Sequence, residues 1–167
     1  MPMLKNIAEL VQAQGHLVLA TCAPGGRGGQ PHASLMAYCP SPDGGEFWLA
    51  TLKETRKYAN LRANPRASLL LDDRVGDRVG DRGGQGGGAP GQALTVDVEL
   101  AAFADAQAEA SARRALLARH PELADFMALP GAVVLRLVGL RYQLLHGLTE
   151  VFVWSPQKNL DGAGRTA

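Results

Sequence analysis

Apolar and polar residues alternate along much of this chain, and this pattern predicts a protein built mainly of β-strands. The clearest case runs from Leu94 to Leu100, where every second residue is apolar and the residues between are polar. A period of two is typical of a strand with one buried face. Further strands are predicted at residues 17–22, 32–38, 46–51, 67–72, 133–145 and 149–154.

Short helices are predicted between the strands. Apolar residues recur at helical spacing over residues 4–11, and Gly15 follows as the expected C-cap. The Ala-rich stretch 106–119 predicts a longer helix with Asp105 as its N-cap. A short helical piece is expected at 121–127, because it begins with a proline, which suits a first helical turn.

A further helix is predicted at residues 55–63, shortly after a strand. The hydroxyl of Thr55 can cap this helix by accepting from an unpaired amide of the first turn, and Asn64-Pro65 ends it. The strongest candidate chemistry in the sequence lies where this strand and this helix meet.

The order of these elements predicts a mainly β fold: a small closed β-barrel of six to seven antiparallel strands, with helices over its ends. The first three strands form a meander. An open α+β sheet is the alternative. A chain of 167 residues is long enough for one hydrophobic core, so residues 1–167 are expected to form a single domain.

Two segments lack the pattern of ordered elements. Residues 73–91 include RVGD twice in succession and then a Gly-rich run, and this composition predicts a flexible surface insertion. The run is not a phosphate-binding P-loop, because it lacks the Lys-Ser/Thr ending and the strand-to-helix setting. The polar tail at 156–167 is expected to be frayed.

Composition narrows the classes of function. The 17 basic and 16 acidic residues nearly cancel, which argues against a nucleic-acid-binding or membrane-surface protein. Cys22 and Cys39 have no partner at the spacing of a disulfide or zinc framework. No catalytic triad order, carboxylate pair or HExxH string supports a hydrolase. No leader or membrane-spanning segment is recognisable, so a cytoplasmic protein is expected.

Hydroxyls and cations gather where the third strand ends and the next helix begins. The residues concerned are Thr51, Lys53, Thr55, Arg56 and Lys57. A helix N-terminus offers unpaired amides and the positive end of its dipole, and an arginine can bind two phosphate oxygens at once. The pattern therefore suits a phosphate group, although spacing alone supports a solvated basic helix start equally well.

Two segments of the sequence resemble a known family. LATCAPGGRGGQPHASLMAY and FWLATLKETRKYANLRANPRASLLLDD are similar to the pyridoxamine 5′-phosphate oxidase-like, FMN-binding split-barrel superfamily, over about residues 17–72. In that family a Ser/Thr-Arg-Lys triplet, before a helix that ends in Asn-Pro-Arg, grips the flavin phosphate. The resemblance implies this role for Thr55, Arg56 and Lys57, with residues 64–66 as the matching helix end.

The resemblance also implies where the isoalloxazine ring lies. In the family the ring lies along the second and third strands, where backbone groups meet its polar edge. The positions implied here are His32, Ala33, Ser34, Leu35, Ala50 and Thr51. An extended strand offers N–H and C=O groups whatever its side chains, and small residues leave room for a flat ring. Judged singly, each of these residues is also an ordinary strand residue.

The sequence departs from the true pyridoxamine phosphate oxidases. Those enzymes have an arginine near the position of His32, a lysine near that of Ala37, and C-terminal tryptophan and arginine residues that hold the substrate phosphate; none is matched here. The resemblance therefore implies an FMN-dependent oxidoreductase acting on another small molecule. It also implies a homodimer with the cofactor at the interface.

The C-terminal half is more similar to the heme-utilisation branch of the superfamily. RHPELADF at 119–126 and VVLRLVGLRYQLLHGL at 133–148 have this likeness, although Gly-Leu-Thr replaces the usual Gly-Phe-Gly. Heme binding and a non-catalytic flavin carrier or sensor are therefore alternatives, as is the deazaflavin F420 in place of FMN. His146, at a strand end, is the better heme-ligand candidate, whereas His120 is interpreted as a polar surface residue at a helix start. No other metal site is expected.

Overall fold

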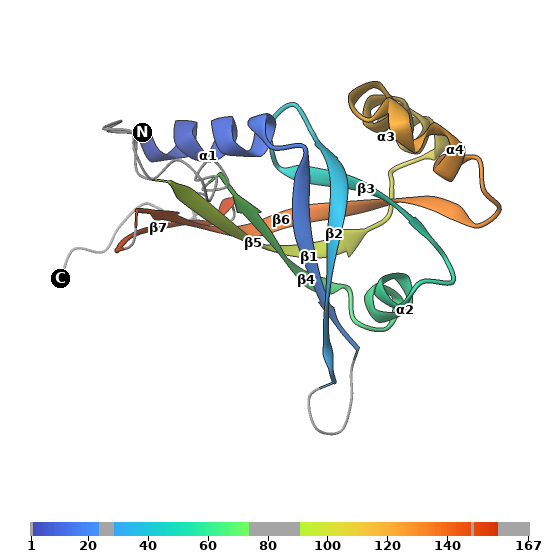
Figure 1. Cartoon of the computed structure of the whole chain (residues 1–167), viewed down its shortest axis with the longest axis horizontal. Helices are drawn as coiled ribbons and strands as arrows, with labels where there is room; N and C mark the ends of the chain where they lie inside the picture. The colour runs from blue at the N-terminus through green and yellow to red at the C-terminus, as the bar shows by residue number, and fades with distance from the viewer. Residues whose placement is uncertain (1, 24–28, 74–90, 148, 157–167) are drawn as a thin grey trace, which may run out of the picture.

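The computed structural model describes residues 2–23, 29–73, 91–147 and 149–156. Its elements are, in chain order, α1 (Pro2–Ala13), β1 (His16–Cys22), β2 (Pro31–Pro40), β3 (Glu46–Leu52), α2 (Arg56–Ala63), β4 (Arg66–Asp72), β5 (Gln92–Ala101), α3 (Ala106–Arg119), the 3-10 turn η2 (Pro121–Leu123), α4 (Ala124–Met127), β6 (Ala132–His146) and β7 (Glu150–Trp154) (Figure 1). Every helix and strand expected from the sequence is present. The expected insertion at 73–91 and the expected tail at 156–167 lie almost wholly outside the described residues. None of the described helices has the length and apolar character needed to span a membrane.

Seven antiparallel strands form one sheet, and six of them close into a barrel. The strand order is β3-β2-β1-β4-β5-β6-β7, and β3 also pairs with β6, from Glu46 opposite Val138 to Leu52 opposite Ala132. This second pairing closes the barrel and leaves β7 outside it, beside β6. The closed barrel is therefore confirmed, and the open sheet is not formed.

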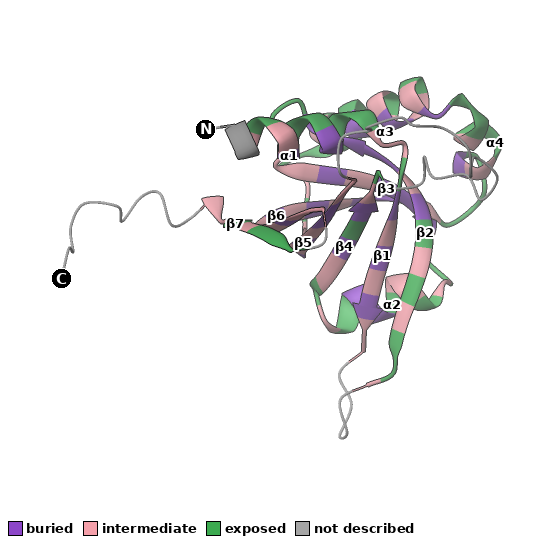
Figure 2. Ribbon diagram, turned by 60° about the vertical axis from the view of Figure 1, so that its left-hand side comes forward, coloured by how far each residue is buried: buried purple, intermediate pink, exposed green. Residues whose placement is uncertain are grey.

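The barrel interior is the main hydrophobic core. Alternate residues of each strand point inward, as the period of two predicts. Large side chains that are fully buried in this core include Tyr38, Phe47, Leu69, Leu94, Leu137 and Tyr142. Helix α1 packs Ile7, Leu10 and Val11 against the same core. Figure 2 shows that buried positions concentrate on the strands, whereas α1 and α3 expose their outer sides.

A second, smaller core lies on the outer face of the barrel. Cys39 of β2, Ala50 of β3 and Val134 of β6 are buried there. Ala112 and Leu116 of α3 pack in the same cluster. Figure 1 shows α3 and α4 together at this side of the barrel, away from α2. The outer core therefore fixes one face of β3, and β3 leads directly into the candidate site.

The end of α1 differs from the expectation. Gly15 is not a left-handed C-cap, because the described glycines with positive φ are Gly44, Gly131 and Gly147. The helix ends two residues before Gly15, and the carbonyl of Gly15 accepts from the amide of Tyr38 at 3.2 Å. The hydrogen bonds between this part of the chain and β2 thus begin at Gly15, one residue before β1. Gly15 therefore has the role of a strand neighbour and not that of a helix cap.

The expected N-cap of α3 is confirmed. Oδ1 of Asp105 accepts from the amide of Ala108 at 2.8 Å, which satisfies one amide of the first turn. We expect Asp105→Ala to lower the free energy of unfolding by about 1 kcal/mol, measured by urea denaturation. Asp105→Asn keeps the capping oxygen and should retain most of this stability. An equal loss in both variants would show that the cap is not the cause.

Candidate functional site

The candidate site begins where β3 ends and α2 starts. Thr51 is buried, with 1% of its surface exposed, and its hydroxyl lies 3.0 Å from that of Thr55. Thr55 is the N-cap residue of α2 and has extended backbone angles. Its hydroxyl donates to the carbonyl of Leu52 at 2.8 Å. Because Thr55 has one hydroxyl proton, Thr51 is the donor between the two hydroxyls.

This geometry corrects the expected cap. The side chain of Thr55 accepts from no amide of α2, because its hydroxyl is turned back toward the end of β3. The first amides of a helix have no acceptor within the helix itself. The amides of Arg56 and Lys57 therefore have no partner from the helix or its cap. The first turn of α2 also has no acidic residue to offset the positive end of the helix dipole.

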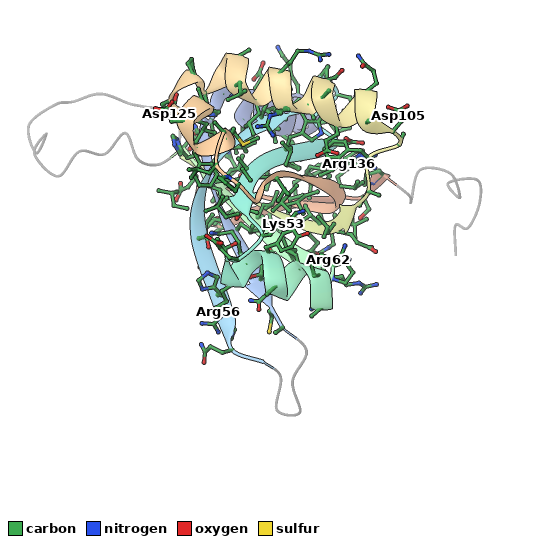
Figure 3. All side chains as sticks on the ribbon, turned by 90° about the vertical axis from the view of Figure 1, so that its right-hand side faces the viewer. Lys53, Arg56, Arg62, Asp105, Asp125 and Arg136 are labelled. Atoms are coloured by element: carbon green, nitrogen blue, oxygen red, sulfur yellow. The ribbon has the colours of Figure 1, made fainter. Side chains whose placement is uncertain are left out.

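Three basic side chains surround this helix start. Lys53 and Arg56 are exposed, and Lys57 is half-buried. A guanidinium nitrogen of Arg56 donates to the carbonyl of Gln30 at 3.4 Å. The amide of Lys53 donates to the carbonyl of Gly131 at 3.0 Å, which holds the β3–α2 connection against the start of β6. Figure 3 shows Arg56 on the β2 side of α2, and Lys53 between α2 and the layer of α3 and α4. Arg56 thus connects the helix start with the residue just before β2.

Strand β2 has a free edge near this helix. Its pairing with β3 covers only residues 38–40, whereas its pairing with β1 covers residues 31–37. The amide of Tyr38 points toward the β1 side, where it bonds to a carbonyl. By the alternation of an antiparallel ladder, the N–H and C=O groups of Ala33 and Leu35 then point away from β1. Within the described residues no strand pairs with those groups, so they are available to a flat ligand.

The side chains of this part of β2 alternate between two faces. Ala33 and Leu35 lie on the outer face, where 73% of Leu35 is exposed. His32 and Ser34 are half-buried on the other face, and Nε2 of His32 lies 3.2 Å from the hydroxyl of Ser34. The exposed side of the strand therefore presents one small and one large apolar side chain beside the free backbone edge.

Ala50 is the sequence-predicted site residue that the structure sets apart from the others. It is 6% exposed and belongs to the outer core with α3. Its backbone pairs with Val134 of β6. The structure therefore brings the hydroxyls and cations of the β3–α2 junction near the free edge of β2, but places the side chain of Ala50 beneath α3.

One buried side-chain amide beneath the junction, that of Asn60, was missed by sequence reasoning. Asn60 of α2 is 5% exposed, and its Nδ2 donates to the hydroxyl of Thr21 at 3.1 Å. One turn later, Nδ2 of Asn64 donates to the carbonyl of Cys22 at 3.1 Å. No local pattern marks Asn60 as buried, because polar residues in a helix are usually exposed.

Neither candidate heme-ligating histidine lies at this junction. His120 is 5% exposed and not a surface residue as expected: its Nε2 lies 2.9 Å from the carbonyl of Tyr38 and its Nδ1 lies 3.0 Å from the carboxylate of Glu122. It is buried because it joins the end of α3 to β2. His146 is half-buried at the opposite end of β6, with Nδ1 3.2 Å from the side-chain amide of Gln92. In the described part of the chain, no three His, Cys, Asp or Glu side chains gather as a metal site.

A hollow of about 510 Å³ lies on the other side of α2. Its lining includes Tyr58, Leu61, Arg62, Phe103, Asp105, Val133 and Arg136. Figure 3 shows Arg62 on α2, with Asp105 and Arg136 across from it near α3. Arg136 is held by the carboxylate of Glu46, and these hydrogen bonds lower the pKa of Glu46. Because Val133 pairs with Thr51, the hollow and the junction share part of a wall.

Comparison with known proteins gives one family. The sequence model described as pyridoxamine 5′-phosphate oxidase matches residues 3–143. A search of curated protein sequences found no match.

Several solved structures have the same fold. A heme-binding protein from Mycobacterium smegmatis superposes with a TM-score of 0.69 at 17% identity, over 90% of this chain and 58% of that protein. An FAD-binding protein from Mesorhizobium loti superposes with a TM-score of 0.61 at 20% identity, over 84% of this chain and 91% of that one. HutZ, the heme storage protein from Vibrio cholerae, superposes with a TM-score of 0.59 at 18% identity, over 89% of this chain and 92% of that one. At these identities the likeness shows the fold alone.

Proposed function

This chain belongs to the pyridoxamine 5′-phosphate oxidase family, and on that premise we propose that it binds FMN and uses it as an oxidoreductase acting on a small molecule. The observation that carries the proposal is the uncapped, basic start of α2 beside the free edge of β2. The flavin phosphate binds at the helix start, and the ring lies along β2.

The helix start has the donors that a phosphate group needs. The amides of Arg56 and Lys57 are free of the helix and of the cap side chain. The guanidinium of Arg56 offers a fork of N–H groups that suits two phosphate oxygens, and the ammonium groups of Lys53 and Lys57 add charge. These groups come from one short segment, so a single phosphate can reach them together.

The free edge of β2 has the groups that a flat ring needs. The backbone of Ala33 and Leu35 offers donors and acceptors, and the small side chain of Ala33 leaves room beside them. The proposed cofactor-binding residues are His32, Ala33, Ser34, Leu35, Ala50, Thr51, Lys53, Thr55, Arg56 and Lys57. Among them Ala50 acts indirectly, because its burial in the outer core fixes the position of β3.

The chemistry of the proposed reaction divides between the cofactor and the chain. When bound, FMN supplies reversible two-electron chemistry at its ring. The residues of the chain hold the phosphate, orient the ring and limit the access of water. His32 and Ala37 stand where the true oxidases have cations for the substrate, so the proposed substrate is not pyridoxamine 5′-phosphate.

We place a second copy of the chain on the outer face of β2, β1 and β4. Val18 is the cross-strand partner of both Leu35 and Leu70, so these three apolar residues lie side by side. Leu35 is 73% exposed and Leu70 is 41% exposed. Adjacent exposed apolar side chains favour burial against a partner. Such a homodimer covers the surface next to the free edge of β2 and completes the pocket around the ring.

Titration with FMN tests the proposed function. We expect the purified chain to bind FMN with micromolar or tighter affinity, seen as quenching of flavin fluorescence, and to bind riboflavin more weakly because it lacks the phosphate. Bleaching of the bound flavin by NADH or NADPH separates an oxidoreductase from a carrier or sensor. The same titration with F420 separates the two flavin classes. If the purified chain binds no flavin under these conditions, the proposed FMN-dependent function is wrong.

Heme binding is the second candidate, and the position of His146 favours it. This histidine is half-buried at the end of β6, and its Nδ1 is near the amide of Gln92. If heme is the cofactor, titration should give a Soret band that His146→Ala removes. Two proteins with this fold, from Mycobacterium smegmatis and Vibrio cholerae, handle heme. FMN binding without a Soret band supports the first candidate instead.

A further inference from the structure

The two halves of the proposed FMN site lie on different elements. The start of α2 supplies Arg56 and Lys57 for the phosphate, and β2 supplies the backbone of Ala33 and Leu35 for the ring. One flavin contacts both halves only if the distance between them suits its length. The spacing of α2 and β2 is therefore a property on which binding depends.

Buried hydrogen bonds join α2 to β2 beneath the surface. Asn60 lies one turn after Arg56, and its Nδ2 donates to the hydroxyl of Thr21 on β1 at 3.1 Å. The hydroxyl of Thr21 in turn donates to the carbonyl of His32 on β2 at 3.4 Å. Asn60 is 5% exposed and Thr21 is 3% exposed. A hydroxyl can donate one bond while it accepts another, so both bonds form at once.

We propose that Asn60 and Thr21 are positioning residues that hold the phosphate-binding end of α2 at a fixed distance from the ring-binding segment of β2. This inference rests on the proposed FMN site and adds two residues that do not contact the cofactor. A ligand that contacts two subsites binds more tightly when the spacing of the subsites is fixed before it binds, because ordering the protein during binding costs free energy. Asn60 and Thr21 supply that order before FMN arrives.

Packing of α2 against β1 does not by itself require polar residues at Asn60 and Thr21. Two buried polar partners can be replaced by apolar groups of the same shape with little loss of stability. Apolar contacts, however, do not fix direction, whereas hydrogen bonds do. Asn64, the C-cap residue of α2, donates from its side-chain amide to the carbonyl of Cys22 and so connects the end of α2 with β1 alone. Asn60 and Thr21 are thus the pair that extends the connection to β2.

The test compares FMN with riboflavin, which has the ring but not the phosphate. The ratio of the riboflavin Kd to the FMN Kd measures how well the two halves of the site act together. Thr21→Val keeps the shape of the side chain and removes its hydroxyl; we expect this ratio to fall about tenfold, which is the effect of losing one net hydrogen bond. Thr21→Ser keeps the hydroxyl and should retain the ratio of the unaltered chain.

Tyr142→Phe is the matched control for stability. This substitution removes another buried hydrogen bond, which the Tyr142 hydroxyl donates to the carbonyl of Gly44 at 3.0 Å. Tyr142 is not part of the proposed FMN site. We expect the substitution to lower the melting temperature and leave the ratio of the two Kd values unchanged. An equal fall of the ratio in Thr21→Val and Tyr142→Phe would overturn the inference, because loosening of the whole barrel would then explain both.

Two further outcomes separate the inference from the proposed function. If the unaltered chain binds FMN far more tightly than riboflavin and Thr21→Val keeps the same ratio, the positioning role is wrong and the FMN site stands. If the unaltered chain binds no FMN, both are wrong. A variant that does not fold is detected by circular dichroism, and Asn60→Leu combined with Thr21→Val then replaces it, because both polar partners are removed together and neither remains unpaired.

Discussion

Replacing Arg56 and Lys57 together with alanine should weaken FMN binding by at least about 100-fold, or about 3 kcal/mol. Each side chain offers a charge-assisted contact to the proposed phosphate, and such contacts contribute about 1.5–3 kcal/mol apiece. Arg56 is exposed, Lys57 is half-buried, and neither side chain belongs to the core, so the double substitution should leave the fold intact. Fluorescence titration with FMN measures the change.

Arg62→Ala is the control for this double substitution. Arg62 is an exposed cation on the same helix, but it lines the hollow on the other side of α2. Its removal should change the FMN Kd by less than about threefold, because only screened charge acts over that separation. Riboflavin binding should be nearly the same in all three proteins. An effect of Arg62→Ala as large as that of the double substitution would point to general charge and not to a phosphate site.

A methyl group at residue 139 should destabilise the fold by about 3 kcal/mol. A Cβ added to Gly139 would lie 2.0 Å from the hydroxyl oxygen of Tyr142 and 2.6 Å from the ring carbon that bears it. The ring has no room to move, because Tyr142 is 1% exposed and its hydroxyl donates to the carbonyl of Gly44 at 3.0 Å. Burial raises the pKa of Tyr142 to about 12, so this donor keeps its proton. Gly139→Ala therefore both crowds the core and strains a buried hydrogen bond.

Thermal and urea unfolding measure this effect. For a chain of this size, a loss of about 3 kcal/mol corresponds to a fall of roughly 10 °C in the melting temperature. Gly15→Ala is the matched control, because a Cβ there meets Cε1 of His120 at an ordinary 3.6 Å and the φ of Gly15 is not positive. It should change stability by less than about 0.5 kcal/mol. Equal stability of the two alanine variants would contradict the crowding at Gly139.

The elements of the fold could be predicted because each has a regular local pattern. The alternation from Leu94 to Leu100 defines most of β5, and Asp105 marks the start of α3 at the residue where the structure begins it. The order of the strands also indicated a closed barrel. The register between β3 and β6 could not be read, because it depends on packing between segments that are far apart in the chain.

The candidate site could be predicted less completely. Thr55 to Lys57 lie at a helix start as expected, but the direction of the Thr55 hydroxyl depends on the neighbouring Thr51 and Leu52. The burial of Ala50 depends on where α3 packs, and no local pattern encodes that. Asn60 is polar, and polar helical residues are usually exposed, so its burial follows only from the path of β1 beneath α2.

The pairing of β3 with β6 also determines when the site can form during synthesis. β1, β2 and β3 are made before β6, so one edge of β3 has no partner until residues 132–138 have been added. Contacts between such distant segments slow folding, and an unpaired strand edge is prone to aggregate while it waits. The proposed FMN-binding segments are thus synthesised before β6 but reach their final positions only after β6 has been added.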